Sequence, residues 1–512
     1  MAEHSAARAL VESISRGFEE FEPPAGPSAA DGPLGWPGYD DQRASATVRT
    51  GAYESVLCGR GWVGSRQAVL VAFAFDFLGG SVGEASGARI VAAFEQAREL
   101  RLPVISLVAS GGSRMQEGIC ALRQLQKIAR ACLLTRKDRI PHVAVLRNPT
   151  TGGMWVALAA AADVVLATSG AAVAFGGSRV RSAAENGEAF HAEGKLADGQ
   201  VDQVVDDAEL PDVLADLVSL LHPQHLVWPA EPAPVPAALT AGGLPATGWD
   251  AVQRARSADR PRARAYLDAY FARRFEISGD RAGGHDDEMI CGFGDHDRHT
   301  IAFAAQTGTA NTPAGFRTAA RLIRLADQLG IPVLTLVDTP GAANDAAAER
   351  GAIGPAIAEV FAAVADARVP AGRRRGRLGR CPGAGRPGAD LDHLGCVLRR
   401  DSTGIQRRDP QARPGRSAGT RRTPAPAPAG PPGPGLRPGH RALTRPSRMG
   451  RDSPRNRRSP RMPDGDSTRN RPGGHVREAR RDKALPLVIN ATSMEGRSGH
   501  VRVLNSGPLD KG

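Results

Sequence analysis

Two pairs of adjacent glycines stand where the backbone of this chain could do chemistry. Gly111-Gly112 and Gly152-Gly153 each follow an apolar run and precede a helical pattern. Glycine permits a sharp turn and a close approach to a ligand, and the first N–H groups of the following helix are free to donate. Two such turns side by side would form an oxyanion hole, in which losing one donor raises a barrier by on the order of 3 kcal/mol. One Gly-Gly pair alone is more often only a tight turn, so the surrounding elements must support this interpretation.

The elements around these glycines occur twice in the sequence. The run LPVISLV at 102–108 matches IPVLTLV at 331–337, an offset of 229 residues. A helical pattern precedes each run, and a glycine-bearing turn follows it, ASGGSRMQEG in the first copy and DTPGAANDAAAERG in the second. The first copy continues with a second strand, RIPHVAVL, before its second Gly-Gly turn. At the same offset the correspondence holds to residue 370 and then stops.

This alternation predicts the domain organisation. Apolar strands that alternate with helices are typical of a mostly parallel sheet covered on its faces. We therefore expect two α/β domains at 45–225 and 255–370, joined by a Pro-, Ala- and Gly-rich linker at 226–254. Residues 1–44 are expected to form an N-terminal arm, and residues 371–512 a low-complexity tail. The second domain is then incomplete on its C-terminal side.

The net charge of +12 is concentrated in one part of the chain. Residues 371–480 hold 27 Arg, no Lys and 8 acidic residues, a net of +19, so the other residues together carry 12 − 19 = −7. A basic body would indicate nucleic acid or a membrane surface as partner, and this body is mildly acidic. The six cysteines include no C-x-x-C pair, which disfavours a disulfide framework and a zinc ribbon. No signal peptide and no apolar run of about 18 residues is found, so we expect a cytoplasmic protein without a membrane span.

The longer strings resemble a known family. FDFLGGSVGEASGARI, LPVISLVASGGSRMQEG, NPTTGGMWVALAAAADVVLA and GAAVAFGGSRV resemble the carboxyltransferase β subunit of bacterial acetyl-CoA carboxylase. RPRARAYLDAYFARRFEISGDRAGGHDDEMICGFG and GFRTAARLIRLADQLGIPVLTLVDTPGAANDAAAERG resemble its α subunit. The chain looks like a single-chain fusion, β-like and then α-like, over about residues 45–370. The resemblance implies an α/β fold of two tandem crotonase-like (ββα spiral) domains, the second truncated and followed by a disordered Arg/Pro/Gly-rich tail.

The resemblance also implies a reaction, carboxyl transfer from N-carboxybiotin on a separate carrier protein to the α-carbon of an acyl-CoA. With acetyl-CoA the product is malonyl-CoA for fatty acid synthesis. This chemistry needs oriented donors for two anions, the thioester enolate and the ureido oxygen of biotin. By resemblance, the amides of Gly152 and Gly153, with the turn at Gly111 and Gly112, hold the thioester oxygen.

The second half is expected to supply the other donors. By resemblance, the turn that contains Gly341 and Ala342 holds the ureido oxygen, together with a glycine-rich turn after the next strand. Arg89 and Arg114 are candidates for the CoA phosphates, although a solvated arginine is the commoner explanation. Only Cys58 stands where β subunits often carry a four-cysteine zinc ribbon, so we expect no zinc or other metal.

The glycine-rich turn expected after the second strand is absent from the second half. In its place stands AGRRRGRLGRCPGAGRPGAD, from residue 371. Arginine without lysine, among Gly, Pro and Ala, is what G+C-rich codons give when they are read out of phase. Codons can be chosen for residues 371–389 so that reading one nucleotide later gives PAVVVGDSGGARALAARA, which contains an apolar strand and a Gly-Gly turn. We therefore interpret the tail as a shifted reading frame and expect weak or no activity from this chain as it stands.

Three functions of different classes remain open. The first is the biotin-dependent carboxyltransferase, which works with a biotin carboxyl carrier protein and a biotin carboxylase. The others are a biotin-independent malonyl- or acyl-CoA decarboxylase, and an inactive binding protein with residues 371–480 as a nucleic-acid-binding arm. We favour the first, with no nucleic acid and no membrane as partners. Acyl-CoA and biotin must meet between two different halves, so we expect a homo-oligomer in which the β-like half of one chain faces the α-like half of another.

Overall fold

The computed structural model describes residues 5–24, 29–177, 187–222 and 246–369, and the backbone of two short strands at 371–372 and 488–489. These residues all belong to one compact unit of the chain, Met1–Thr403 with Lys483–Gly512. Within the described ranges, no helix combines the length and the apolar character needed to span a lipid bilayer. The tail expected to be disordered lies outside the described residues, apart from the two short strands.

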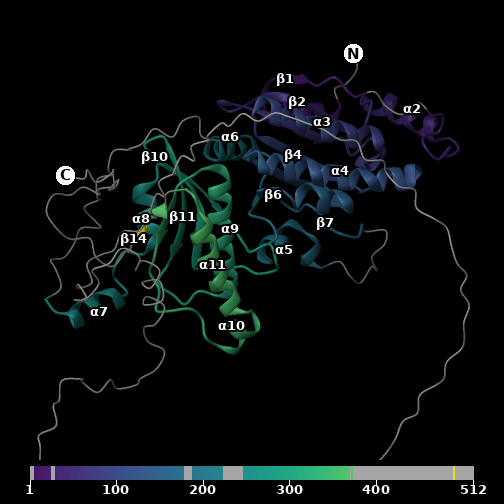
Figure 1. The fold of residues 1–512 in the computed structure, drawn as a ribbon. Coiled ribbons are helices and arrows are strands. Elements are labelled where there is room, and N and C mark those ends of the chain that lie inside the picture. Colours follow the sequence, from purple (N-terminus) through teal and green to yellow (C-terminus); the bar gives the residue numbers. More distant parts are fainter. Residues whose placement is uncertain are drawn as a thin grey trace, which may run out of the picture. The chain divides into compact units, whose positions relative to one another are not determined.

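The first half of the chain builds a mixed eight-stranded sheet (Figure 1). The strand order is β1-β2-β3-β4-β5-β6-β8, and the short strand β7 pairs with β5. The first three strands pair antiparallel, and the pairs from β3 to β8 are parallel, as the alternation of strands with helices predicts. The strands are β1 (Arg16–Glu20), β2 (Val56–Val63), β3 (Arg66–Phe73), β4 (Val104–Ser110), β5 (His142–Thr151), β6 (Val164–Thr168), β7 (Val173–Ala174) and β8 (Gln203–Val205).

Helices cover both faces of this sheet because its strands are apolar on both sides. In β3, Val69 and Val71 face the core formed with α3 and α4, while Leu70 faces the core formed with α1 and α6. The helices are α1 (Ala6–Ile14), α2 (Tyr39–Thr50), α3 (Glu84–Leu100), α4 (Gly118–Lys137), α5 (Ala192–Ala197) and α6 (Leu210–Leu221). Shorter turns are η1 (Leu78–Gly80), η2 (Met115–Glu117), the π-helical η3 (Trp155–Ala159) and η4 (Glu188–Phe190).

The segment expected to be an N-terminal arm is built into the first half. β1 pairs with β2, and α1 buries Ala7, Val11 and Ile14. Helix α2 crosses the expected boundary at residue 44. The described part of residues 1–44 is therefore integrated with the first sheet rather than separate from it.

The second half builds a smaller sheet in the order β13-β12-β11-β10-β9, with β14 also paired to β12. One face packs against α9, and the other packs Phe303 and Leu334 against Leu267 of α8. The strands are β9 (Arg273–Ile277), β10 (Met289–His296), β11 (His299–Gln306), β12 (Val333–Leu336), β13 (Ala371–Gly372) and β14 (Val488–Ile489). The helices are α7 (Gly248–Arg256), α8 (Ala263–Tyr270), α9 (Pro313–Leu329), α10 (Ala346–Arg350) and α11 (Ile353–Asp366).

The structure shows the internal repeat that the sequence predicts. Helices α3 and α9 both have 17 residues, and their first residues, Glu84 and Pro313, are 229 apart. The hairpins β2–β3 and β10–β11 have eight residues in each strand and the same pairing register. Isolated bridges Val82↔Ser113 and Asn311↔Ala342 also keep the offset of 229. Each half is therefore the same α/β unit.

The repeat weakens at the strand that should follow β12. In the first half β4 pairs with the ten-residue β5, starting at Val104↔His142. The equivalent pair is Val333↔Ala371, and β13 ends one residue later, at Gly372. The next positions of β12 pair instead with β14, from the far end of the chain.

A buried carboxylate joins the two halves. The Asp202 carboxylate accepts the backbone N–H of Val165 at 2.8 Å and that of Ser278 at 3.1 Å. It also forms ion pairs with Arg281 and Arg321. Burial would raise the pKa of Asp202, but the two guanidinium groups hold this pKa below its usual value.

Candidate functional site

The two glycine pairs of the first half lie against each other. Gly112 follows β4 with φ +108°, and Gly152 follows β5 with φ +67°, both values that L side chains rarely adopt. A Cβ placed on Gly152 would lie 3.1 Å from the Cα of Gly112. The side-by-side arrangement expected from the sequence is therefore present, and it requires glycine for both conformation and space. We call Gly111, Gly112, Gly152 and Gly153 the acyl-side turns.

Most amides of the acyl-side turns are already used inside the protein. The Gly111 N–H donates to the Gly79 carbonyl at 2.9 Å, and the Gly112 N–H donates to Ser110 Oγ at 3.0 Å. The Gly152 N–H donates to the Phe175 carbonyl at 3.0 Å. The Gly153 N–H has no acceptor among the described residues, and it opens the helical turn that leads into η3. Of the four amides, Gly153 is the one that the structure leaves free to donate to an incoming oxygen.

The second half carries an equivalent turn after β12. Gly341 has φ +142°, and its N–H donates to Thr339 Oγ1 at 3.0 Å. A Cβ on Gly341 would meet no atom of the described residues within 4 Å, so this part of the chain leaves that side of the turn open. The Ala342 N–H has no acceptor among the described residues, while the next amide, that of Ala343, donates to the Asn311 carbonyl at 2.9 Å. The open face and one free amide leave room here for a polar oxygen.

A buried ion pair fixes the start of this second turn. Asp338 follows β12, is 5% exposed and pairs with Arg260, and it lies 3.6 Å from Arg262. Its backbone carbonyl accepts the N–H of Gly308 at 2.8 Å. No hydrogen bond among the described residues joins this turn to the acyl-side turns, so each half presents its own set of donors.

Arg114 is not a ligand for CoA phosphate, contrary to the expectation from the sequence. Its side chain is 1% exposed, and its guanidinium pairs with Glu54 and donates to Tyr39 Oη at 3.0 Å. A guanidinium that is enclosed and paired in this way cannot reach a phosphate in solvent. Neighbours up to 75 residues away in sequence bury it, which no local pattern could indicate.

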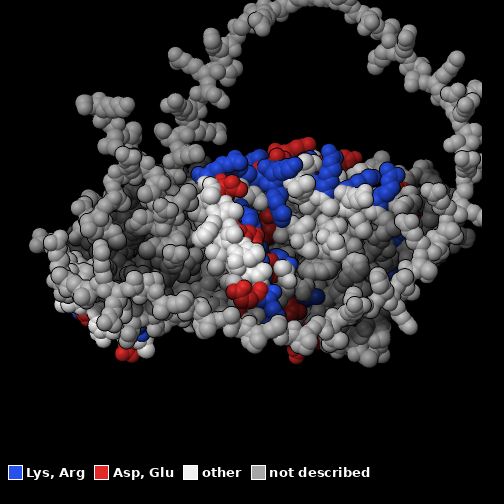
Figure 2. Space-filling model, turned by 60° about the horizontal axis from the view of Figure 1, so that its bottom comes forward, with Lys and Arg blue, Asp and Glu red and all other residues white. Residues whose placement is uncertain are grey.

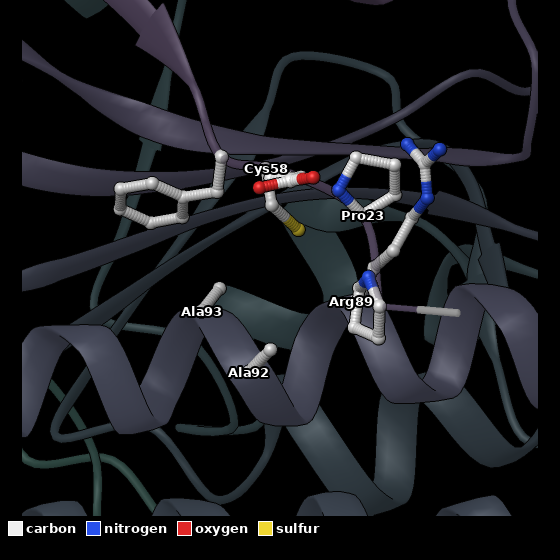
Figure 3. Close-up of a pocket in the computed structure, with 8 residues that line it drawn as sticks. Pro23, Cys58, Arg89, Ala92 and Ala93 are labelled. Atoms are coloured by element: carbon white, nitrogen blue, oxygen red, sulfur yellow. The ribbon is translucent and has the colours of Figure 1, made fainter. Parts of the chain in front are cut away.

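Arg89 is also engaged within the protein. Its guanidinium lies 3.6 Å from the Glu20 carboxylate and donates to the Val56 carbonyl at 3.3 Å. Figure 3 shows Arg89 with Ala92 and Ala93 on α3, opposite Cys58 and Pro23, around a small pocket. The pocket has a volume of about 10 Å³, the space of roughly one water molecule, so it cannot hold an acyl-CoA.

Helix α4 carries exposed positive charge that the sequence reasoning missed. Arg123, Lys127 and Arg130 are exposed, follow the spacing of one helix face, and α4 contains no acidic residue. We call these three residues the basic row. On the face of the molecule shown in Figure 2, Lys and Arg side chains gather in a band with a few acidic side chains among them. The signal was present in the sequence as basic residues at i, i+4 and i+7.

The described residues contain no group of three or more His, Cys, Asp or Glu side chains placed to bind a metal. The described cysteines, Cys58, Cys120, Cys132 and Cys291, are free thiols. Burial raises the pKa of Cys58, Cys132 and Cys291 to about 12, which keeps these thiols protonated. The expectation of no zinc stays a prediction for the whole chain.

Comparison with protein families gives two matches in chain order. Residues 36–203 match the family described as "Carboxyl transferase domain". Residues 245–372 match the family described as "Acetyl co-enzyme A carboxylase carboxyltransferase-like". The two matches fall on the two halves of the repeat.

Curated relatives span the same two halves. The "Acetyl-coenzyme A carboxylase carboxyl transferase subunits beta/alpha" of Saccharopolyspora erythraea is 33% identical over 390 residues, 72% of this chain and 67% of that protein. The "Probable biotin-dependent acyl-coenzyme A carboxylase beta3 subunit" of Mycobacterium tuberculosis is 36% identical over 336 residues, 63% of this chain and 66% of that protein. The chain spans 61% to 67% of the length of the curated relatives that it matches.

The fold also matches a solved structure. The transcarboxylase 12S hexamer, with methylmalonyl-coenzyme A and methylmalonic acid bound, superposes with a TM-score of 0.59 and 21% identity. The match covers 72% of this chain and 69% of that chain. At this identity the likeness concerns the fold, and it includes both halves.

Proposed function

Because the chain belongs to the family of acetyl-CoA carboxylase carboxyltransferases, we propose that it is the carboxyltransferase component of a biotin-dependent acyl-CoA carboxylase. The observation that carries the proposal is that each half holds a glycine turn with an amide free to donate among the described residues, Gly153 after β5 in the first half and Ala342 after β12 in the second. We propose acetyl-CoA as the acyl substrate and malonyl-CoA as the product, since the Saccharopolyspora relative is named for acetyl-CoA.

The acyl-side turns are suited to hold a thioester oxygen. Gly153 offers its N–H at the start of a helical turn, and Gly152 and Gly112 let the two turns pack closely against each other. As the α-carbon loses its proton, negative charge grows on the thioester oxygen, and a donor fixed in advance stabilises that charge. One such donor is worth on the order of 3 kcal/mol in the barrier.

The turn at Gly341 and Ala342 is suited to a second polar oxygen. The free N–H of Ala342 fits the ureido oxygen of biotin, and no side chain of the described residues lies within 4 Å of the Cβ position at Gly341. Biotin, when bound in carboxylated form on its carrier, supplies the carboxyl group as CO2 and a base for the α-proton. The part of this chain is to orient that oxygen and to hold the charge that develops on it.

The basic row is our assignment for the phosphates of CoA. Arg89 and Arg114 are occupied, whereas Arg123, Lys127 and Arg130 have no ion-pair partner among the described residues. At about 1.5 Å per residue, the row starts about 8 Å and ends about 18 Å along α4 from its first residue, Gly118, which follows Gly112 by six residues in sequence. The long pantetheine arm of CoA separates its phosphates from its thioester over a distance of this order.

The proposed partners are those that the two roles require, the thioester oxygen in the first half and the ureido oxygen of biotin in the second. We propose a biotin carboxyl carrier protein and a biotin carboxylase as partners, and a homo-oligomer in which the first half of one chain faces the second half of another. Among the described residues no hydrogen bond joins the two sets of turns, so the proposed arrangement breaks no contact between them. An isologous dimer would form two such sites at once.

The experiment is a reconstituted carboxylation assay. The chain is mixed with acetyl-CoA, a carrier and biotin carboxylase from a related organism, ATP and bicarbonate, and malonyl-CoA is measured with and without avidin. We expect malonyl-CoA formation that avidin abolishes, weak or undetectable with the chain as it stands and faster with a chain whose codons after residue 370 are restored to the alternative frame. In a separate incubation the chain is given malonyl-CoA alone. Acetyl-CoA formed there at a rate that avidin does not change would instead indicate a biotin-independent decarboxylase.

A further inference from the structure

Arg114 lies at the centre of a buried hydrogen-bond network just after the acyl-side turns. Its guanidinium pairs with Glu54, donates to Ser55 Oγ at 3.1 Å and to Tyr39 Oη at 3.0 Å, and is the largest fully buried side chain of the described residues. Burial alone would raise the pKa of Glu54, but the guanidinium holds this pKa below its usual value. The pair therefore stays charged, and a buried charge pair persists only when its hydrogen bonds are complete.

The same guanidinium holds the loop on which the acyl-side turns rest. Arg114 Nη2 donates to the Ser81 carbonyl at 2.7 Å. That loop supports the turn directly, because the Val82 N–H donates to the Gly112 carbonyl at 2.9 Å and the Gly79 carbonyl accepts the Gly111 N–H at 2.9 Å. A shift of the loop would therefore move both glycines.

Tyr39 connects α2 to this network. Its hydroxyl donates to Glu117 Oε1 at 2.6 Å while it accepts the bond from Arg114. The other oxygen of Glu117 accepts the N–H of Glu84, the first residue of α3, at 2.6 Å. Burial raises the pKa of Tyr39, so the hydroxyl keeps its proton and remains a donor.

Among the described residues, the second half of the repeat has no counterpart of this network, although it has the same fold. At the offset of 229, Arg114 falls on Ala343 and Glu117 falls on Ala346. The loop between strand and helix has ten residues in the first half, 74–83, and six in the second, 307–312. The fold therefore does not require the network or the longer loop, and both belong to the half that carries the acyl-side turns.

We propose that Tyr39, Arg114 and Glu54 form a positioning network that sets the orientation of the acyl-side turns, so that α2 takes part in catalysis without touching the substrate. This inference rests on the proposed function for its catalytic consequence. Tyr39 is the member best suited to a test, because Tyr39→Phe removes one hydroxyl and leaves the buried ring and the ion pair in place.

The first measurement is hydrogen exchange on the free protein, which needs no substrate. In Tyr39→Phe we expect the amides of 110–114 to exchange about tenfold faster than in the unchanged protein, with exchange in α9 unaffected. Tyr53→Phe is the matched control, because Tyr53 is 79% exposed and lies outside the network. Unchanged exchange at 110–114 would overturn the inference, whatever the outcome of the carboxylation assay.

The second measurement separates positioning from substrate binding. In the carboxylation assay, Tyr39→Phe should lower kcat about tenfold and leave the KM for acetyl-CoA within about twofold, because no contact with CoA is removed. Arg114→Lys keeps the charge but not the planar fork, and should show a larger loss in kcat. A raised KM with unchanged kcat would contradict a positioning role. Absence of activity even in a chain whose codons after residue 370 are restored to the alternative frame would refute the proposed function and leave the exchange result to decide this inference.

Discussion

His142 gives the structure a pH dependence that can be measured. It lies on β5 and is 4% exposed, with Ser106 Oγ 2.9 Å from its Nε2 and the Phe94 ring edge-on at 5.0 Å. Burial first, and then the nearby Arg136, lower its pKa from 6.5 to about 3. The unfolded chain therefore binds a proton below pH 6.5 that the folded protein does not bind until about pH 3. Stability linked to His142 is present above pH 6.5 and is lost as the pH falls.

The size of the effect follows from these two values. At pH 5 the unfolded imidazole is almost fully protonated and the folded one is neutral, which costs about 2 kcal/mol of unfolding free energy. At pH 7 the cost nearly vanishes. Urea unfolding at both pH values should show that His142→Gln, which cannot titrate, loses about 2 kcal/mol less between pH 7 and pH 5 than the unchanged protein.

His299→Gln is the control for the histidine-to-glutamine change itself, since His299 is the first residue of β11 in the second sheet. The neighbouring Asp163, whose pKa burial raises, is present in all three proteins, so its contribution cancels in the comparison. Equal pH dependence of His142→Gln and the unchanged protein would refute the assignment of a buried, neutral imidazole.

Four further outcomes are expected. Gly152→Ala should lower the carboxylation rate at least tenfold and the free energy of unfolding by about 1–2 kcal/mol. Gly170→Ala is the control and should keep activity, because Gly170 has the same φ of +67° but no neighbour within 4 Å among the described residues. Equal activities of the two variants would contradict the close packing of Gly152 against Gly112. Changing all three residues of the basic row to Ser should raise the Kd for acetyl-CoA about tenfold, weaken the salt dependence of this Kd, and have a smaller effect on the Kd for dephospho-CoA. An unchanged Kd in calorimetry would show that the basic row does not bind CoA. Asp202→Asn should lower the free energy of unfolding in urea by about 3 kcal/mol, because it removes the carboxylate that pairs with Arg281 and Arg321. A loss below about 1 kcal/mol would show that these ion pairs do not hold the two halves together. Resequencing the gene across codons 365–375 should find a shifted frame; an uninterrupted frame with a protease-resistant tail would overturn that interpretation.

The repeat and the glycine turns could be predicted from the sequence because both are local patterns. An apolar strand, a glycine turn and a helix leave the same signature each time they occur, and the offset of 229 reappears in α3 and α9 and in the bridge at Ala342. The hairpins β2–β3 and β10–β11 repeat at an offset of 233 instead, and the sequence did not indicate this because only Cys58, Gly59, Gly61 and Ala72 recur there as identical residues.

The roles of the arginines could not be predicted in this way. Arg114 is enclosed by Glu54, 60 residues earlier, and by Tyr39, 75 residues earlier, and only the folded chain brings these groups together. Which amides are free to donate could not be predicted either, because the N–H groups of Gly111 and Gly152 donate to carbonyls of loops distant in sequence. Sequence patterns locate turns, while tertiary packing decides which of their donors remain free.

The strand after β12 is short where the repeat predicts a long one. β13 starts at the position that the repeat predicts and ends after Gly372, so the second glycine-rich turn of the second half lies outside the described residues. A chain whose codons after residue 370 are restored to the alternative frame should carboxylate acetyl-CoA faster than the chain as it stands. Equal rates would show that the turn at Gly341 and Ala342 is sufficient on the ureido side.

The central claim, that the chain moves a carboxyl group between an acyl-CoA and biotin, is tested most directly by the reverse reaction with free biocytin. Purified chain is incubated with malonyl-CoA, with and without biocytin, and acetyl-CoA is measured by chromatography. The account predicts acetyl-CoA that forms only in the presence of biocytin and at a rate that saturates with its concentration. Acetyl-CoA formed equally fast without biocytin, or no acetyl-CoA even with biocytin and the restored frame, would contradict it.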